Sequence, residues 1–333
     1  MNLRSGSKFI GIAVSVVTLL IFIVVYGPNT LIQTFSTLPP SFILFFLLAL
    51  SLHILSFLFW AIRIKWLSQT NGYKITFLKS LNAVMTSLFA ASITPGYVGG
   101  EPVRIKKLID YGEPGGTATA IALGERGFDS IFFVGVFAFA ILTGLETLTG
   151  DLRILAAIGI ALLVIFVTFL LISMRASSLM KRLEGWIGRV VGRFGKRRKK
   201  YEESLPKIFA QVETYASSTK KIFLQHPGAL VLGVLVTSFL WLSDFMVPTA
   251  LMLGFGVMPD IIDVIFIQVL LVLISLIPVT PGSAGIMEIL MIATFSGFLP
   301  HGRIVAFVIM WRFITFYFNL IVGSLLLHHI VIK

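Results

Sequence analysis

The chain has no cysteine and little charge, and these two absences exclude several kinds of protein. Without cysteine, the 333 residues can form no disulfide, thiolate nucleophile or cysteine-ligated metal site. Charged residues make up 13% of the chain and hydrophobic residues 57%, and the mean hydropathy is +0.97. Because a soluble domain does not have this composition, the sequence predicts an all-α protein with several membrane spans.

Groups suited to catalysis are also scarce. The five histidines include the adjacent His328 and His329, which cannot share a helix face and are poor joint metal ligands. The sequence contains no recognisable nucleophile–base pair and no nucleotide-binding loop. We therefore expect no enzymatic activity, metal or cofactor. An intramembrane enzyme acting on lipid phosphate is a weaker alternative.

Six apolar runs are long enough to cross a bilayer, which takes about 20 helical residues. They cover about 9–27, 41–62, 120–145, 153–173, 228–254 and 304–332. The first run is long for a signal peptide and lacks a cleavage site, so we expect an uncleaved span. Two further apolar regions, about 80–110 and 264–299, have shorter arms of about 15 residues, which predict re-entrant helical hairpins.

Basic residues fall mainly on one side of this arrangement. With the N-terminus inside, segment 174–227 and its thirteen Lys and Arg residues lie inside, and the uncharged loop 28–40 lies outside. Of 27 basic residues, only Arg153 and Arg303 fall at outer ends. Because cytoplasmic loops are rich in Lys and Arg, we expect a multi-pass plasma-membrane protein with both termini and segment 174–227 in the cytoplasm.

Segment 174–227 combines helical periodicity with a basic run. Apolar residues from Leu183 to Phe194 recur at helical spacing, which predicts an amphipathic helix on the inner membrane surface. Positions 196–200 are all Lys or Arg. Next to membrane spans, such a run favours contact with anionic lipid headgroups or a role in topology over nucleic-acid binding.

The pattern Thr-Pro-Gly-x-x-Gly occurs twice, at Thr94–Gly99 and Thr280–Gly285. An arginine follows each copy, and Arg312 lies 186 positions after Arg126, just as Thr280 lies 186 positions after Thr94. Each half of the chain is expected to contain span, span, hairpin and span, and this odd number of crossings inverts the second half. The sequence therefore predicts two inverted-topology repeats, residues 1–150 and 151–333, rather than a chance match.

Each Thr-Pro-Gly is expected to start a helix within the membrane, because threonine is a good N-cap and proline suits the first helical position. The unpaired N–H groups and positive dipole ends of two such helices would point into a common space that suits a phosphate or carboxylate. Glycines would allow close approach of a ligand or another backbone. These glycines are Gly96, Gly99, Gly100, Gly282 and Gly285.

Two buried arginines are expected to face the interior of the bundle, because an arginine in hydrocarbon is costly. Arg126 and Arg312 would bind an anion through their planar forks, or form internal salt bridges with Glu125, Asp129 or Glu288. Both alternatives stay open. Glu101 and Glu288, about two turns into the new helices, would bind an ammonium headgroup, relay protons or neutralise arginine.

Other polar residues in the predicted spans have simpler explanations. Asp244 is expected to be paired, and His53 is expected to be a satisfied interior residue rather than a proton carrier. Tyr97 would either contact a ligand or anchor packing at the first hairpin tip. An interfacial belt at the inner surface is expected from Trp60, Arg63 and Trp66.

The residues around the two motifs resemble those of a known family. The string Pro95-Gly-x-x-Gly-Gly-Glu101-x-x-Arg104 is followed by Glu125-Arg126-x-x-Asp129, a second Pro281-Gly-x-x-Gly and Arg312. This combination resembles the flippase-like transmembrane family, the membrane region of lysylphosphatidylglycerol synthases of the MprF type, which also occurs as standalone YbhN-like proteins. The resemblance covers nearly the whole chain. The aminoacyl-transferase domain of the MprF type does not follow Lys333, so synthase activity is not expected.

The resemblance implies translocation of a lipid between leaflets, which for the MprF type is an aminoacylated phosphatidylglycerol. It marks five positions as functional, namely Glu101, Arg104, Glu125, Arg126 and Arg312. The full expected substrate site adds Thr94, Asp129, Thr280, Glu288 and the five motif glycines.

We therefore expect a flippase that moves a phospholipid or another phosphate-bearing lipid through a midplane anion site. The alternative is a proton-coupled secondary transporter of a small anionic solute. The expected partners are membrane lipids with anionic headgroups and, through self-association, further copies of the chain. Nucleic acid is not an expected partner.

Overall fold

The described part of the protein is entirely helical, as the composition predicts. The computed structural model describes residues 28–143, 198–225, 227–275, 280 and 282–331, together with single positions within 17–24 and 161–172. No strand occurs in these ranges. The predicted spans at 9–27 and 153–173 and the amphipathic stretch 183–194 lie outside the described residues, apart from those single positions.

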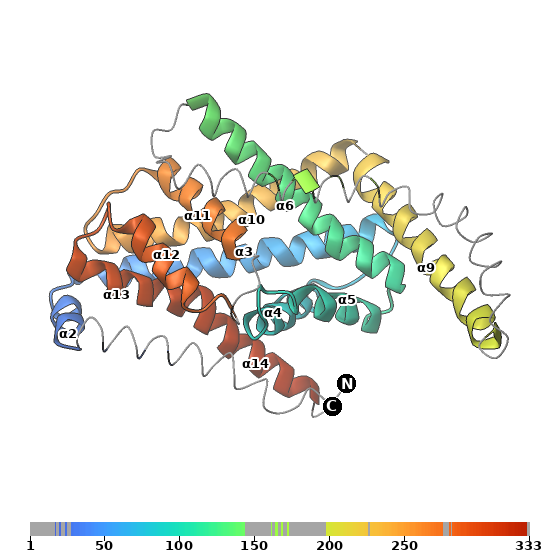
Figure 1. Cartoon of the computed structure of the whole chain (residues 1–333), viewed down its shortest axis with the longest axis horizontal. Helices are drawn as coiled ribbons and strands as arrows, with labels where there is room; N and C mark the ends of the chain where they lie inside the picture. The colour runs from blue at the N-terminus through green and yellow to red at the C-terminus, as the bar shows by residue number, and fades with distance from the viewer. Residues whose placement is uncertain are drawn as a thin grey trace.

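Long helices form the body of the molecule. Helices α3 (Phe42–Thr70) and α10 (Pro227–Gly254) lie side by side along its length, and α6 (Gly115–Thr143) crosses them (Figure 1). Three described stretches are long and apolar enough to span a membrane, namely Phe42–Thr70, Gly228–Gly254 and Gly302–Leu325. They match three of the predicted spans. The predicted span 120–145 falls on α6, which carries three charged residues in its middle.

Pairs of short helices occupy the places where hairpins are predicted. Helix α4 (Phe77–Ser92) packs against α5 (Gly100–Asp110), and α11 (Ile261–Ser275) contacts α12 (Ile286–Phe295). Each of these helices is shorter than the roughly 20 residues that cross a bilayer. One copy of the repeated motif connects the two helices of each pair. The depth of either pair in the membrane stays a prediction.

The remaining helices lie around this body. Helix α2 (Pro28–Ser36) contacts α13 (His301–Arg312), which continues through the π-helix η1 (Phe313–Tyr317) into α14 (Phe318–Val331). Helix α9 (Arg198–Leu224) packs along α6 and projects from one end of the bundle (Figure 1). Its contact with α6 is close, because a Cβ added at Gly116 would lie 2.3 Å from the Gln211 carbonyl oxygen.

Local sequence explains where α3 and α4 end and begin. Helix α3 stops at Asn71, and Gly72 follows with φ +90°, the left-handed conformation that commonly ends helices. Thr76 then caps α4, since its side-chain oxygen accepts a hydrogen bond from the Lys79 backbone N–H at 3.3 Å. Helix α3 therefore continues well past the apolar run that predicts a span only to residue 62.

Three apolar cores hold the described helices together; one joins α6 to α10 and α11 around Phe245, and α3 contributes to the other two. One of these two joins the first half of α3, around Ala49, to α10, α11, α12 and α13. The other joins its second half, around Ile64, to α4, α5, α6 and α9. On α3, the polar residues His53 and Ser56 are buried between the two cores. The candidate functional site lies at this boundary.

Candidate functional site

A cavity of about 200 Å³ lies between the two cores of α3, and Trp241 and Val272, which pack against the third core, also line it. Its wall takes residues from α3, α4, α5 and α6 on one side and from α10, α11, α12, α13, η1 and α14 on the other. Tyr97 of the first motif lies in the wall. The polar side chains that line the cavity are His53, Ser56, Trp60, Ser87, Tyr97, Glu101, Arg104, Arg126, Trp241, Asp244, Gln268, Ser275, Trp311, Arg312, Thr315 and Asn319.

The two copies of the motif share a backbone turn as well as a sequence. Gly96 and Gly282 have φ of 57° and 56°, and the next residues, Tyr97 and Ser283, have φ of 58° and 50°. A positive φ is uncommon for residues other than glycine. Helices α5 and α12 then begin at equivalent positions, Gly100 and Ile286, directly after the last motif glycine.

The helices do not begin at the Thr-Pro step, so that prediction is wrong. The Thr94 hydroxyl donates to the Ala90 carbonyl oxygen at 2.9 Å, and its oxygen accepts from the Gly99 N–H at 2.9 Å. Thr94 therefore ends α4 and closes the turn, and Gly99 is the N-cap of α5. The left-handed residues after Pro95 cannot belong to a right-handed helix, which delays the helix start.

The second copy is closed by different hydrogen bonds. The Thr280 hydroxyl donates to the Ala284 carbonyl oxygen at 2.8 Å. Gly285 has φ +86°, and its N–H donates to the Glu288 carboxylate at 2.7 Å. Glu101 and Glu288 lie in the first turn of α5 and α12. The two glutamates were expected about two turns into the helices. That expectation is wrong, because the helices begin later in the sequence than predicted.

The two motif turns contact each other, as the sequence predicts. The Gly282 N–H donates to the Thr94 carbonyl oxygen at 3.2 Å, and the Tyr97 hydroxyl donates to the Gly282 carbonyl oxygen at 3.1 Å. A Cβ at Gly282 would lie 2.2 Å from the Phe316 ring. One at Gly99 would lie 2.7 Å from the Thr94 side chain. Both glycines are therefore required for these close approaches.

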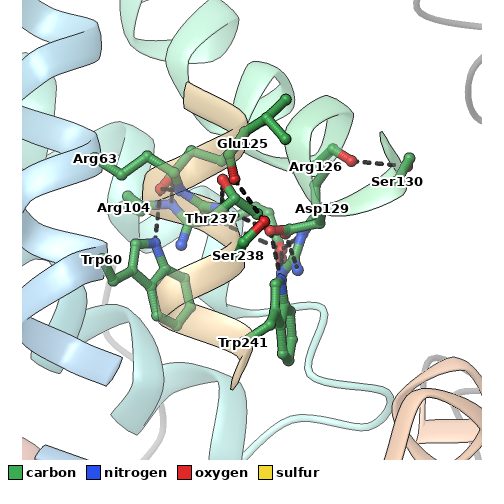
Figure 2. A network of polar contacts seen from close by, with 12 residues as sticks. Trp60, Arg63, Arg104, Glu125, Arg126, Asp129, Ser130, Thr237, Ser238 and Trp241 are labelled. Atoms are coloured by element: carbon green, nitrogen blue, oxygen red, sulfur yellow. Dashed lines mark hydrogen bonds and ion pairs between the residues drawn. The ribbon is translucent and has the colours of Figure 1, made fainter. Parts of the chain in front are cut away.

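Six charged side chains beside the cavity form a closed ring of alternating sign, which we call the charge ring. Figure 2 labels all of its members except Glu101. Three helices supply it, with one arginine on α3, two residues on α5 and three on α6. In order around the ring, its members are Arg63, Asp129, Arg126, Glu101, Arg104 and Glu125.

Four of the six contacts in the charge ring are close ion pairs made by Arg63 and Arg126. Arg63 lies 2.6 Å from Asp129 through Nη1 and 3.2 Å from Glu125 through Nε. Arg126 Nε donates to Glu101 at 2.9 Å, and its Nη1 lies 3.3 Å from Asp129. The sequence left open whether Arg126 forms internal salt bridges, and it does, with Asp129 among its partners.

Arg104 closes the charge ring. Its Nε lies 3.0 Å from Glu125, and its Nη2 lies 3.7 Å from Glu101. The Arg104 guanidinium also lies 5.1 Å from the centre of the Trp60 ring, within the range of a cation–π contact.

Tryptophan and threonine side chains add hydrogen bonds to the charge ring. Trp60 Nε1 donates to Glu125 at 2.6 Å, and Trp241 Nε1 donates to Asp129 at 2.9 Å. Arg63 Nη1 donates to the Thr237 hydroxyl oxygen at 3.1 Å. Figure 2 shows these side chains converging from α3, α6 and α10. Buried charges require such partners, and Arg104 Nε and Glu125 Oε2, which have no hydrogen bond, face each other as an ion pair.

The predicted interfacial belt is therefore wrong. Arg63 is 1% exposed, and Trp60 lines the cavity. Trp66 packs edge-on against the Phe128 ring at 5.9 Å. A basic residue at the end of an apolar run usually marks the membrane surface, and only the packing of α3 against α6 and α10 reveals the buried position of Arg63.

Two members of the charge ring differ from the others in exposure. The side chains of Arg126 and Glu101 are 31% and 24% exposed, and both line the cavity. The other four are at most 4% exposed. Arg104 also lines the cavity, but Arg126 and Glu101 are the members most open to a molecule in it.

A separate pair, Arg312 and Glu288, lies across the cavity. Arg312 Nε donates to Glu288 at 2.7 Å, and its Nη2 donates to the Gly282 carbonyl oxygen at 3.3 Å. The Phe316 ring lies 4.3 Å from the guanidinium carbon. Arg312 ends α13 at the start of the π-helix η1, an irregularity that is frequent at functional sites. Each motif is thus followed by a glutamate in the first turn of the next helix, and this glutamate pairs with the arginine that follows the same motif. The pairs are Glu101 with Arg126 and Glu288 with Arg312.

His53 and Asp244 are paired, as expected for both residues. His53 Nδ1 lies 2.6 Å from the Asp244 carboxylate, and Nε2 lies 3.1 Å from the Asn319 side-chain oxygen. His53 is 3% exposed. Among the described residues, no group of three His, Cys, Asp or Glu side chains is placed to hold a metal ion.

The apolar spans and the charged interior together define an integral membrane protein. The family model of the lysylphosphatidylglycerol synthase TM region matches residues 8–323, and the chain belongs to this family. The expected family is therefore confirmed.

Two archaeal relatives carry the description UPF0104 membrane protein. The protein of Archaeoglobus fulgidus is 34% identical over 326 residues, which is 97% of either chain. That of Methanothermobacter thermautotrophicus is 26% identical over 253 residues, covering 74% of this chain and 72% of the relative.

Proposed function

We propose that the protein moves a phosphate-bearing lipid between the two leaflets of the membrane, with its headgroup in the central cavity. The position of Arg126 is the observation that supports this proposal most directly. It is a cavity-lining arginine, its side chain is 31% exposed, and its carboxylate partner Glu101 is reachable from the same space. A guanidinium suits bidentate contact with a phosphate.

The lipid phosphate would replace the Glu101 carboxylate as the ion-pair partner of Arg126. Breaking a buried ion pair without replacement costs about 3–5 kcal/mol, so an empty cavity keeps the pair closed. An entering phosphate restores the counter-charge. Glu101 then becomes free to contact an ammonium group, where the lipid carries one. In this proposal the headgroup phosphate would enter the cavity of about 200 Å³, and the acyl chains would stay in the surrounding bilayer.

We further propose that residues 1–150 and 151–333 are two inverted-topology repeats. The equivalent φ angles of the two motif turns support this arrangement, as do the equivalent pairs Glu101–Arg126 and Glu288–Arg312. An inverted repeat lets a site near the midplane face either leaflet. The short helix pairs α4–α5 and α11–α12 would then re-enter from opposite sides.

The proposed activity leaves the lipid covalently unchanged, so it needs no cofactor or metal. We place the protein in the plasma membrane, with the basic segment 174–227 on the cytoplasmic lipid surface. Anionic lipids are the proposed partners there. Copies of the chain could associate without changing the site.

Purified protein in liposomes tests the proposal. Fluorescent phosphatidylglycerol, phosphatidylethanolamine and phosphatidylcholine are quenched from outside, and the rate at which the inner-leaflet pool becomes quenchable is measured. Arg126→Gln is expected to reduce this rate at least tenfold, because the phosphate loses its cation. Lys106→Gln, which changes an exposed cation, serves as the control. Equal rates for wild type and Arg126→Gln with every headgroup would contradict the site.

A second candidate function is transport of a small soluble anion. The small volume of the cavity favours it, because a free phosphate or carboxylate needs no opening toward the lipid. Uptake of radiolabelled phosphate by the same liposomes, without movement of fluorescent lipid, would select this alternative.

A further inference from the structure

His53 has a hydrogen-bond acceptor at both ring nitrogens. Nδ1 faces the Asp244 carboxylate at 2.6 Å, and Nε2 faces the Asn319 side-chain oxygen at 3.1 Å. A neutral imidazole has only one N–H and would leave one of these contacts between two acceptors. Only the doubly protonated imidazolium donates to both.

This conclusion requires the Asn319 oxygen, rather than its amide nitrogen, to face His53. A second hydrogen bond fixes that orientation. Asn319 Nδ2 donates to the Thr315 carbonyl oxygen at 2.6 Å. A carbonyl oxygen only accepts, so turning the amide over would place two oxygens against each other. The Asn319 oxygen is therefore held toward His53.

The surroundings of His53 make its charge depend on Asp244. The Phe57 ring lies edge-on at 4.5 Å, and the Phe318 ring lies at 6.3 Å. These rings exclude water, and Asp244 is the carboxylate in contact with the imidazole. Asp244 is itself 26% exposed and lines the cavity, so protons can reach the pair from there.

We propose that His53, Asp244 and Asn319 form a proton-binding site that couples the movement of one proton to that of the anion in the cavity. This inference rests on the proposed transport function. The proton adds to the free ring nitrogen of a neutral His53, and the resulting imidazolium donates to Asp244 and Asn319. No other bond forms or breaks.

The charge balance of the polar interior gives the direction of coupling. With His53 protonated, five cations balance five carboxylates, and loss of the proton leaves one excess negative charge. The cations are Arg63, Arg104, Arg126, Arg312 and His53, and the carboxylates are Glu101, Glu125, Asp129, Asp244 and Glu288.

An entering anion therefore binds better when His53 is protonated, because excess negative charge in a poorly solvated interior repels it. By linkage, the anion also favours proton binding. The proton and the anion thus travel in the same direction. A singly charged phosphate with one proton carries no net charge, so the membrane potential does not oppose their movement.

Other groups on the cavity wall are charged or titratable, and none of them contacts His53. The first motif turn contributes Tyr97, α5 contributes Glu101 and Arg104, α6 contributes Arg126, and α13 contributes Arg312. Helices α4 and α11 contribute only the uncharged Ser87, Gln268 and Ser275. The arginines pair with carboxylates, which leaves His53 as the group whose protonation changes the charge balance.

Liposomes with an imposed pH gradient, acid inside, test the coupling with fluorescent phosphatidylglycerol. For one proton per lipid, a gradient of about one pH unit supports up to about a tenfold ratio between leaflets. The wild type is expected to accumulate the lipid in the outer, alkaline-side leaflet. His53→Gln and Asp244→Asn are expected to move the lipid only to its resting distribution. Asp110→Asn, a carboxylate-to-amide change at the surface, is expected to accumulate lipid like the wild type.

The outcomes separate this inference from the proposed function. If the wild type moves lipid but the gradient leaves its distribution unchanged, or if His53→Gln still accumulates lipid, the coupling is overturned and the lipid function stands. If no lipid moves, radiolabelled phosphate is tested under the same gradient. Accumulation on the alkaline side, lost in His53→Gln, would support coupling to a free anion, and no effect of the gradient would overturn it.

Discussion

The Tyr97 hydroxyl donates to the Gly282 carbonyl oxygen at 3.1 Å and thereby joins the two copies of the motif. The two residues are 185 positions apart. They bring the turn between α4 and α5 against the turn that precedes α12. Arg312 donates to the same carbonyl oxygen. One backbone carbonyl thus connects both motifs with the arginine that follows the second.

Tyr97→Phe is expected to weaken the contact between the motifs without unfolding the protein. The hydroxyl hydrogen bond contributes about 0.5–1.5 kcal/mol, and the aromatic ring stays in place. Thermal unfolding of the purified protein in detergent measures the loss as a small decrease in Tm. Tyr73→Phe, outside the cavity wall, is the matched control. A decrease as large for Tyr73→Phe would show that the effect is not specific to the motifs.

Gly282→Ala is expected to destabilise the protein far more than an alanine elsewhere. The new Cβ would lie 2.2 Å from the Phe316 ring and 2.7 Å from the Ser92 carbonyl oxygen, at a φ of +56°. Overpacking of this kind costs about 1–3 kcal/mol or more, and left-handed backbone adds about 1–2 kcal/mol. Gly297→Ala is the control, because its added Cβ meets nothing within 4 Å. Equal Tm values for the two variants would contradict the close packing of the motifs.

Arg63→Met is expected to destabilise the protein through the carboxylates that it leaves behind. Asp129 and Glu125 would each lose an ion-pair partner at a buried position, and breaking a buried pair costs about 3–5 kcal/mol. Removing the Asp129 charge as well, in Arg63→Met with Asp129→Asn, is expected to recover part of the loss. Denaturant unfolding of the wild type, the two single variants Arg63→Met and Asp129→Asn, and the double variant measures this coupling. Additive effects of the two substitutions would show that the charge ring does not act as a unit.

Glu113→Gln is expected to change how stability depends on pH. Glu113 lies in the turn between α5 and α6, is 3% exposed, and burial raises the pKa of its carboxyl above the ordinary 4.5, with Ser68 offsetting only part of the rise. The folded protein therefore binds more protons than the unfolded chain between pH 4.5 and the raised value. Stability falls as pH increases through this window.

The substitution removes that proton uptake. Glu113→Gln should therefore be more stable than the wild type at neutral pH, and the advantage should shrink as the pH falls toward the ordinary pKa of a glutamate. Tm values measured from mildly acidic to neutral pH test the expectation. An advantage of the same size at every pH would contradict a titrating Glu113.

Regular patterns in the sequence predict much of this structure. Length and apolarity predict α3, α10 and the continuous stretch through α13 and α14. The repeated motif predicts the contact between the two turns. The equal spacing of Arg126 and Arg312 identifies two of the three arginines that line the cavity. Each of these features depends on residues that are close in the chain or that repeat at a fixed distance.

Features that depend on pairing between distant helices could not be predicted. Arg63 follows an apolar run, where a basic residue ordinarily marks the membrane surface, and its partners lie on another helix more than 60 positions away. The pairing of His53 with Asp244 spans 191 positions. The helix starts were misplaced because Thr-Pro favours an N-cap locally, while the left-handed turn after it depends on contact with the second motif.

The division of the apolar interior into separate cores determines which contacts resist movement. Close-packed side chains behave as rigid blocks, since interiors deform little without losing contacts. A rotation of one core of α3 against the other would shift the third core, which joins α6 to α10 and α11, and would otherwise exchange mainly hydrogen bonds and ion pairs. Water or a bound anion can replace those polar contacts, whereas neither can replace a buried phenylalanine. The energetic barrier between the two cores is therefore one that a charged ligand is able to lower.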